Sequence, residues 1–169
     1  LFFFISTKFL PVVAAILPLR IIARDLQLLN TYAVLIILDT AMNLPLAVWM
    51  LRSFFGEVPR ELKEAAQMDG TGLYGQLKDV MLPIVAPGVA ATALVCFIFA
   101  WNEYAFALML STERARTAPP SIPTILGRGG IEWSAIAAGT LGFLIPVVIV
   151  TFALRKYLLR GVTFGAIRQ

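Results

Sequence analysis

The chain has 169 residues, of which 59% are hydrophobic and only 14% are charged. An average soluble domain is about 45–50% apolar and roughly a quarter charged, so this composition indicates a membrane protein. The formal net charge is +4, histidine is absent and Cys96 is the single cysteine, which excludes disulfide frameworks and Cys/His metal sites.

Long apolar stretches predict about four membrane spans, because a bilayer core needs roughly 20 residues of helix. Their expected bounds are 1–23, 32–51, 84–110 and 135–154. A soluble all-helical core is the alternative, but so many long apolar runs in one short chain disfavour it. The sequence therefore predicts an all-α, polytopic membrane protein with a single transmembrane domain over residues 1–169.

Residues 57–83, between the second and third spans, form a charged, helix-forming block with a glycine at its centre. Pro59 suits the first turn of a helix, where its missing N–H is no loss. Asp69-Gly70 is typical of a helix end, because glycine can adopt a left-handed conformation. A second short helix is expected to end before Pro83. This pattern predicts a helix–turn–helix that lies in water or against another protein; an ordinary helical loop is the alternative.

The basic residues predict the orientation, since cytoplasmic loops carry an excess of lysine and arginine. One side carries the residues between the second and third spans and those after the fourth: Arg52, Arg60, Lys63, Lys78, Arg155, Lys156, Arg160 and Arg168. The opposite side carries Arg20, Arg24, Arg114, Arg116 and Arg128. The bias places residues 57–83 and the C-terminus in the cytoplasm. Basic residues that flank apolar runs also favour membrane topology over nucleic-acid binding.

Polar residues at membrane depth are costly and indicate functional sites. Asp39 and Asn43 share one face of the second span, and Asn102 and Glu103 lie beside aromatic residues in the third. Carboxylate and amide groups beside an aromatic ring suit the hydroxyls of sugars and polyols, so these four residues are candidates for the translocation path. They could instead pair with other spans or cap a broken helix, and Lys8 could neutralise either acid.

The spacing of Glu64-Ala65-Ala66, Gly70, Val80 and Leu82-Pro83 resembles the EAA motif of ABC-importer permeases. Val80 stands where the family usually has isoleucine. Other stretches are similar to the carbohydrate branch of that family and extend the resemblance over nearly the whole chain. They are Asn43-Leu44-Pro45 with Arg52–Phe55, Glu57-Val58-Pro59, Phe97–Glu103 and Gly161–Ala166.

The resemblance implies the helical bundle of a type I ABC importer permease. Family members usually have six spans, so the chain is expected to be the C-terminal portion, with about two spans missing. In this family the cytoplasmic helix–turn–helix inserts into a cleft on an ATP-hydrolysing subunit. The residues expected to couple this chain to the ATPase are Glu64, Ala65, Ala66, Asp69 and Gly70.

The resemblance also implies the partners: a dimer of ABC ATPases that holds ATP and Mg, a second permease subunit in a heterodimer, and an extracytoplasmic solute-binding protein facing residues 112–134. The expected location is the bacterial inner membrane. No cofactor, metal, nucleic acid or catalytic constellation is expected in this chain, which is interpreted as a transport subunit rather than an enzyme.

The expected substrate is a sugar or sugar alcohol. Ser6–Pro11 and Cys96–Glu103 are most similar to sorbitol/mannitol permeases, which favours a polyol. The main alternative is an ion-gradient-driven secondary transporter or channel, which would need no ATPase partner. A membrane-embedded enzyme would have only Asp39 and Glu103 as candidate acid and base.

Overall fold

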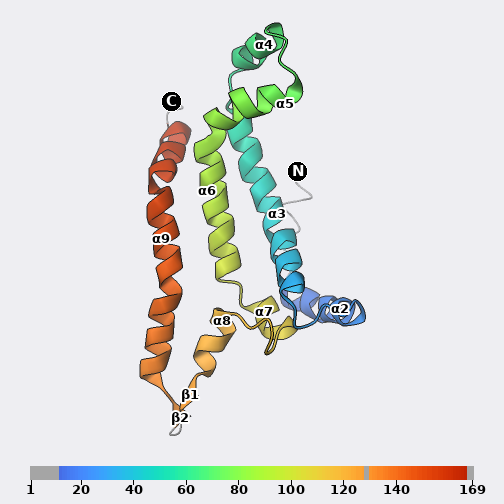
Figure 1. The fold of residues 1–169 in the computed structure, drawn as a ribbon, viewed down its shortest axis with the longest axis vertical. Coiled ribbons are helices and arrows are strands. Elements are labelled where there is room, and N and C mark those ends of the chain that lie inside the picture. Colours follow the sequence, from blue (N-terminus) through green and yellow to red (C-terminus); the bar gives the residue numbers. More distant parts are fainter. Residues whose placement is uncertain (1–11, 128–129, 167–169) are drawn as a thin grey trace. The chain divides into compact units, whose positions relative to one another are not determined.

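The computed structural model describes residues 12–127 and 130–166, and most of these residues are helical (Figure 1). The three long helices among them are α3 (Tyr32–Gly56), α6 (Leu82–Trp101) and α9 (Trp133–Ala166). Helical stretches long and apolar enough to cross a membrane are Tyr32–Gly56, Leu73–Trp101 and Trp133–Arg155. These helices confirm the predicted all-α, polytopic membrane fold.

Residue contacts divide the chain into two compact units. The first unit combines residues up to Pro45 with Phe97–Ile149, and the second combines Leu46–Cys96 with the residues from Val150 onward. Helices α3, α6 and α9 each contribute residues to both units.

The first unit contains the short elements. They are α2 (Val12–Asp25), α7 (Ala105–Leu110), α8 (Ala118–Ser121), the 3-10 turn η3 (Ile122–Thr124), and an antiparallel ribbon of β1 (Leu126–Gly127) and β2 (Gly130–Ile131). Helix α2 packs against α7 (Figure 1). The core at this contact is apolar; its buried residues are Ile16, Ala23, Val34, Leu35, Phe106, Ala107, Leu110 and Ala115.

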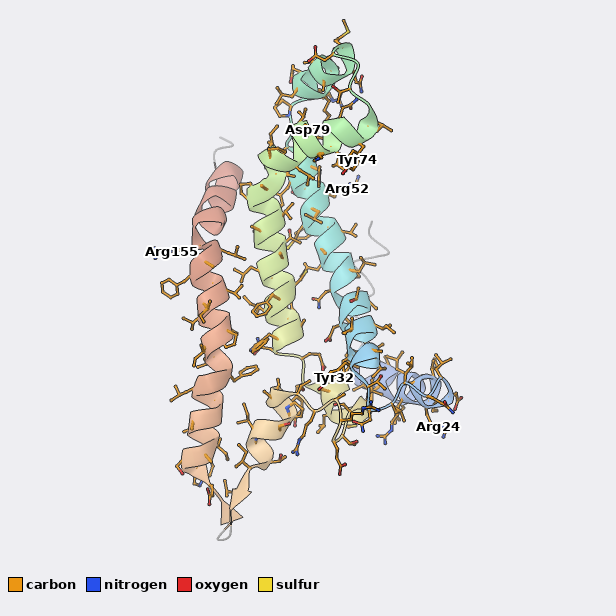
Figure 2. The ribbon with its side chains drawn as sticks, in the orientation of Figure 1. Arg24, Tyr32, Arg52, Tyr74, Asp79 and Arg155 are labelled. Atoms are coloured by element: carbon orange, nitrogen blue, oxygen red, sulfur yellow. The ribbon has the colours of Figure 1, made fainter. Side chains whose placement is uncertain are left out.

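Asn30 joins the α2–α3 turn to the loop that follows α7. Its φ of 58° is left-handed, a region that asparagine tolerates better than most residues. The Asn30 side-chain Oδ1 accepts the backbone N–H groups of Thr112, Arg114 and Ala115 at 2.9, 3.1 and 3.3 Å. Arg24, near the end of α2, and Tyr32, at the start of α3, flank this turn (Figure 2). One side chain thus satisfies three backbone donors distant in sequence.

The second unit contains the helix–turn–helix. Helix α4 (Arg60–Met68) is followed by α5 (Leu73–Gly75), which continues directly into a π-helical segment, η2 (Gln76–Met81), and α4 packs against η2. The expected second helix ending before Pro83 is wrong in one respect, because η2 continues into α6 without a break. Pro83 has no N–H to donate and its ring crowds the preceding turn. The wider π-helical turn of η2 accommodates this ring and lets the helix continue into α6.

The helices also differ from the expected spans. Residues 1–11, including Lys8, lie outside the described residues, and the described part of the 1–23 stretch begins α2, which has 14 residues. The 84–110 stretch is not one helix, because α6 ends at Trp101 and α7 begins at Ala105. The second and fourth stretches lie within the longer helices α3 and α9.

Candidate functional site

The helix–turn–helix of residues 60–81, called here the EAA element, turns sharply at Gly70. The backbone N–H of Gly70 donates to Gln67 O and that of Thr71 donates to Ala66 O, both at 3.0 Å. Gly70 has a φ of 72°, as its position after α4 predicted. A Cβ atom at Gly70 would have no heavy atom within 4 Å. The turn therefore requires glycine for its backbone conformation and not for lack of space.

The second limb of the EAA element closes back on the turn. Gln76 is buried, and its side-chain Nε2 donates to Thr71 O at 2.8 Å. A Cβ atom at Gly75 would lie 2.5 Å from Thr71 Cγ2, so the turn packs tightly over the start of η2. Tyr74 and Asp79 mark α5 and η2 in Figure 2. These contacts make the element a compact two-limbed unit.

The five expected ATPase-coupling residues do not share one surface. Glu64, Ala65, Asp69 and Gly70 are exposed, but Ala66 is only 6% exposed. Since its backbone carbonyl also accepts the Thr71 N–H, Ala66 belongs to the interior of the element. Of the two alanines expected to couple this chain to the ATPase, only Ala65 is therefore open to a partner.

Three large apolar side chains around the turn are exposed instead. Met68 is 89%, Leu73 84% and Tyr74 75% exposed; together they are called the apolar tip. Our reading of the sequence missed these residues, although large apolar residues inside a charged segment were a usable signal. Exposed apolar area of this kind, next to polar residues, marks interaction surfaces.

The second group of candidates lies in the first unit, around a small cavity. Asp39 from α3 and Glu103, in the break after α6, both line a space of about 180 Å³ with Trp101, Thr117 and Phe143. The structure therefore brings together one acid from each of the two predicted pairs. Asn43 and Asn102 are not among its lining residues.

Glu103 starts helix α7. Its Oε1 accepts the backbone N–H of Phe106 at 2.7 Å, and its Oε2 accepts that of Ala107 at 2.9 Å. The first N–H groups of a helix have no partner within that helix, and a carboxylate satisfies them. The alternative reading of Glu103, as the cap of a broken helix, is what the contacts show.

The two asparagines bond to their own helices. Asn43 Nδ2 donates to Asp39 O at 2.9 Å and Asn102 Nδ2 donates to Ile98 O at 2.8 Å, each four residues back. Asn43 Oδ1 is buried and has no hydrogen-bond partner within the described residues. The same holds for the Thr117 hydroxyl.

Trp101 adjoins both this cavity and a larger groove of about 660 Å³. Its Nε1 donates to Phe143 O at 3.1 Å, and the two rings stack with centroids 5.4 Å apart. In the groove, Arg116 Nη2 donates to Thr124 Oγ1 at 2.8 Å. The Trp101 indole and the Thr124 hydroxyl of the groove therefore have intramolecular partners, whereas only one of the five Arg116 N–H donors has one among the described residues.

The residues that the structure describes contain no group of three or more His, Cys, Asp or Glu side chains suited to a metal ion. The site chemistry thus consists of carboxylates, amides, hydroxyls and aromatic rings.

Residues 1–164 match the family described as "Binding-protein-dependent transport system inner membrane component". A probable ABC transporter permease of Sinorhizobium fredii is 37% identical over 161 residues, 95% of this chain and 58% of that protein. A trehalose/maltose transport system permease of Thermococcus litoralis is 40% identical over 141 residues, 82% of this chain and 51% of that protein. A trehalose transport system permease of Mycobacterium tuberculosis is 35% identical over 161 residues, 94% of this chain and 59% of that protein. The chain thus spans a little over half the length of these relatives.

Proposed function

The chain belongs to the family of binding-protein-dependent transport system inner membrane components, and from that membership we propose that it is a permease subunit of an ATP-driven carbohydrate importer. ATP hydrolysis takes place on a separate ATPase dimer, which holds the ATP and Mg. A second permease subunit, forming a heterodimer, and an extracytoplasmic solute-binding protein complete the transporter in the bacterial inner membrane.

The observation that carries this proposal is the EAA element. Its compact fold and its exposed apolar tip supply the two properties that a coupling contact needs. A rigid two-limbed unit can pass a rigid-body displacement to the helices attached to it. When a partner covers exposed apolar side chains, the free energy of the complex falls by about 25 cal/mol for each Å² of apolar surface removed from water.

Within the EAA element, Glu64, Ala65, Asp69, Gly70 and the apolar tip are proposed to contact the ATPase. Ala66 is proposed to support the element from inside, since it is buried. The exposed acids are proposed to lie at the polar rim of the contact, where charge affects partner choice more than affinity.

The experiment that tests this role compares two glycines of the turn. Gly70→Val forces a β-branched residue to a φ of 72°, which costs roughly 1–3 kcal/mol. Gly72→Val is the matched control, because Gly72 has a φ of −67° and its Cβ would also meet nothing within 4 Å. We expect the full-length Gly70→Val permease to reach the membrane but to co-purify with less ATPase, while Gly72→Val retains it. Equal ATPase recovery with both variants would contradict the coupling role.

The proposed orientation puts the EAA element and the C-terminus in the cytoplasm. The excess of basic residues on that side supports it, and so does the role itself, because the ATPase works where ATP is. The loop of residues 112–134 then faces the solute-binding protein outside.

For the translocation path we propose Asp39 as the solute-facing acid, with Glu103 beside it. The support is the cavity that both residues line, together with the fact that Asp39's carboxylate has no hydrogen-bond partner within the described residues, whereas Glu103 is engaged at α7. Asn43 and Asn102 bond to their own helices and are proposed only as secondary members of the path.

The proposed solute is a sugar or a sugar alcohol. The names of the relatives favour sugars, since two of them are permeases for trehalose or maltose, while the polyol remains a proposal from sequence similarity. An uptake panel of trehalose, maltose, sorbitol and mannitol separates the two. Uptake of sorbitol or mannitol in preference to both disaccharides would support the polyol, and the reverse would overturn it.

A further inference from the structure

Phe54 and Gly88 make an unusually close contact at the base of the EAA element. A Cβ atom at Gly88 would lie 2.5 Å from both Cδ atoms of Phe54 and closer still to Cγ. Two non-bonded carbons normally approach to about 3.5–4.0 Å. Any residue other than glycine at position 88 must therefore displace the Phe54 ring. Glycine is disfavoured inside helices, so its presence in α6 has a packing reason here.

The contact between Phe54 and Gly88 connects the two helices on either side of the EAA element. Phe54 lies two residues before α3 ends at Gly56, and Gly88 lies in the second turn of α6, which begins at Leu82. These two helices lead into and out of the EAA element. The contact thus joins the two ends of the segment 55–87 at its base.

The surroundings of Gly88 are buried on the same face of α6. Val85, Ala91 and Thr92 are all buried, and the Thr92 hydroxyl donates to Gly88 O at 2.8 Å. This bond satisfies the polar group within its own helix. The half-buried Phe54 ring therefore meets a buried face of α6, where packed side chains resist deformation.

We propose that Phe54 and Gly88 form a clamp that makes the EAA element and the adjoining ends of α3 and α6 move as one body. The inference rests on the proposed coupling function and assigns to this pair the step that follows ATPase docking. With the clamp closed, a displacement of α4 reaches both helices together. Without it, the two helices change their mutual angle and absorb the displacement.

The test uses the full-length permease assembled with its partner subunits, in a Cys96→Ala background that carries spin labels at Gln67→Cys and Ala93→Cys, two exposed positions outside the proposed ATPase contact. Gly88→Leu opens the clamp. Gly88→Leu combined with Phe54→Ala moves the bulky side chain from α3 to α6 and restores the fit. Gly56→Leu is the matched control, because a Cβ there would have no heavy atom within 4 Å. The two readouts are the 67–93 distance distribution and the amount of sugar or polyol transported per ATP hydrolysed.

We expect a narrow distribution for wild type and Gly56→Leu, unchanged when ATP and vanadate trap the ATPase. Gly88→Leu should broaden it about twofold and lower transport per ATP by roughly tenfold, because motion of the element no longer reaches the spans. ATPase binding should persist, which separates lost transmission from general misfolding. The double variant should regain a narrow distribution and most of the transport ratio.

An unchanged distribution and transport ratio in Gly88→Leu would overturn the clamp, and so would a failure of Phe54→Ala to restore them. If the wild-type permease binds no ATPase, the proposed function fails. The distance distributions of the permease alone would still report whether the clamp exists.

Discussion

Asp39 and Glu103 line the same cavity but have different roles in the structure. Both Glu103 oxygens accept backbone N–H groups at the start of α7, while Asp39's carboxylate has no hydrogen-bond partner within the described residues. Two carboxylates facing one small space repel each other. A solute whose hydroxyl groups donate hydrogen bonds to the Asp39 carboxylate would offset that repulsion. Asp39 is therefore the stronger candidate for solute contact.

Replacing each acid should therefore affect different properties. Asp39→Asn keeps the size of the side chain and should reduce uptake with little change in thermal stability. Glu103→Ala removes a helix cap and should lower the free energy of unfolding by about 1 kcal/mol. Thermal unfolding in detergent and vesicle uptake measure the two effects. Asp25→Asn, at an exposed ion pair with Arg24, is the control. Equal losses of stability in both acid variants would contradict this division.

Within the EAA motif, the backbone conformation of Gly70 could be predicted from the sequence, whereas the burial of Ala66 could not. Gly70 was predictable, because a left-handed helix end depends on local chain geometry, and its φ of 72° confirms it. The burial of Ala66 was not predictable, because the motif grouped Ala66 with the exposed residues Ala65 and Asp69 as an expected contact of the ATPase. This burial results from the second limb folding back, a tertiary contact that periodicity cannot report.

At the scale of elements, the apolar tip distinguishes the EAA element from an ordinary connecting loop. Met68, Leu73 and Tyr74 are the most exposed large apolar side chains among the described residues. They lie within a segment that also carries the exposed acids Glu64 and Asp69. An apolar centre with a polar rim is typical of protein–protein contacts, and buried tyrosines often dominate their binding energy.

Tyr74→Ser should weaken ATPase retention more than any exposed polar change in the same element. Loss of a buried aromatic anchor typically costs 2 kcal/mol or more, which is roughly thirtyfold in affinity. Gln67→Ser, an exposed position on α4, is the matched control. Co-purification at increasing dilution measures the difference, and equal retention of both variants would show that the tip lies outside the contact.

The helix ends show where element prediction succeeded and failed. The long apolar helices followed from composition, because roughly 20 uncharged residues have few other stable arrangements in a bilayer. The break at 102–104 was predicted only as an alternative, in which Glu103 caps a broken helix, because an apolar sequence continues on both sides; the Glu103 contacts with α7 show that cap. At Pro83 the error was the opposite one: a helix end was predicted before Pro83, but the π-helical turn of η2 continues into α6.

At the scale of the whole molecule, the proposed function requires the EAA element to face the ATPase in the cytoplasm. The charge bias and the proposed ATPase contact support the same orientation, with residues 57–83 in the cytoplasm. Charge counting could predict this side only modestly, because basic residues lie on both sides of the predicted spans.

Single cysteines in a Cys96→Ala background test the orientation. Met68→Cys should react with a membrane-impermeant maleimide in inverted vesicles but not in intact cells, whereas Glu132→Cys should react in intact cells. Both positions are exposed, so access to reagent rather than burial decides the result. Labelling of both residues from the same side would refute the proposed topology.

The most direct test of the central claim is uptake of a sugar or polyol by the complete transporter in proteoliposomes, with ATP inside, the solute-binding protein outside and no ion gradient. We expect uptake that requires the ATPase, that is abolished by Gly70→Val and that is preserved in Gly72→Val. Uptake that proceeds without the ATPase, driven by an imposed ion gradient and indifferent to Gly70→Val, would contradict the claim and identify a secondary transporter.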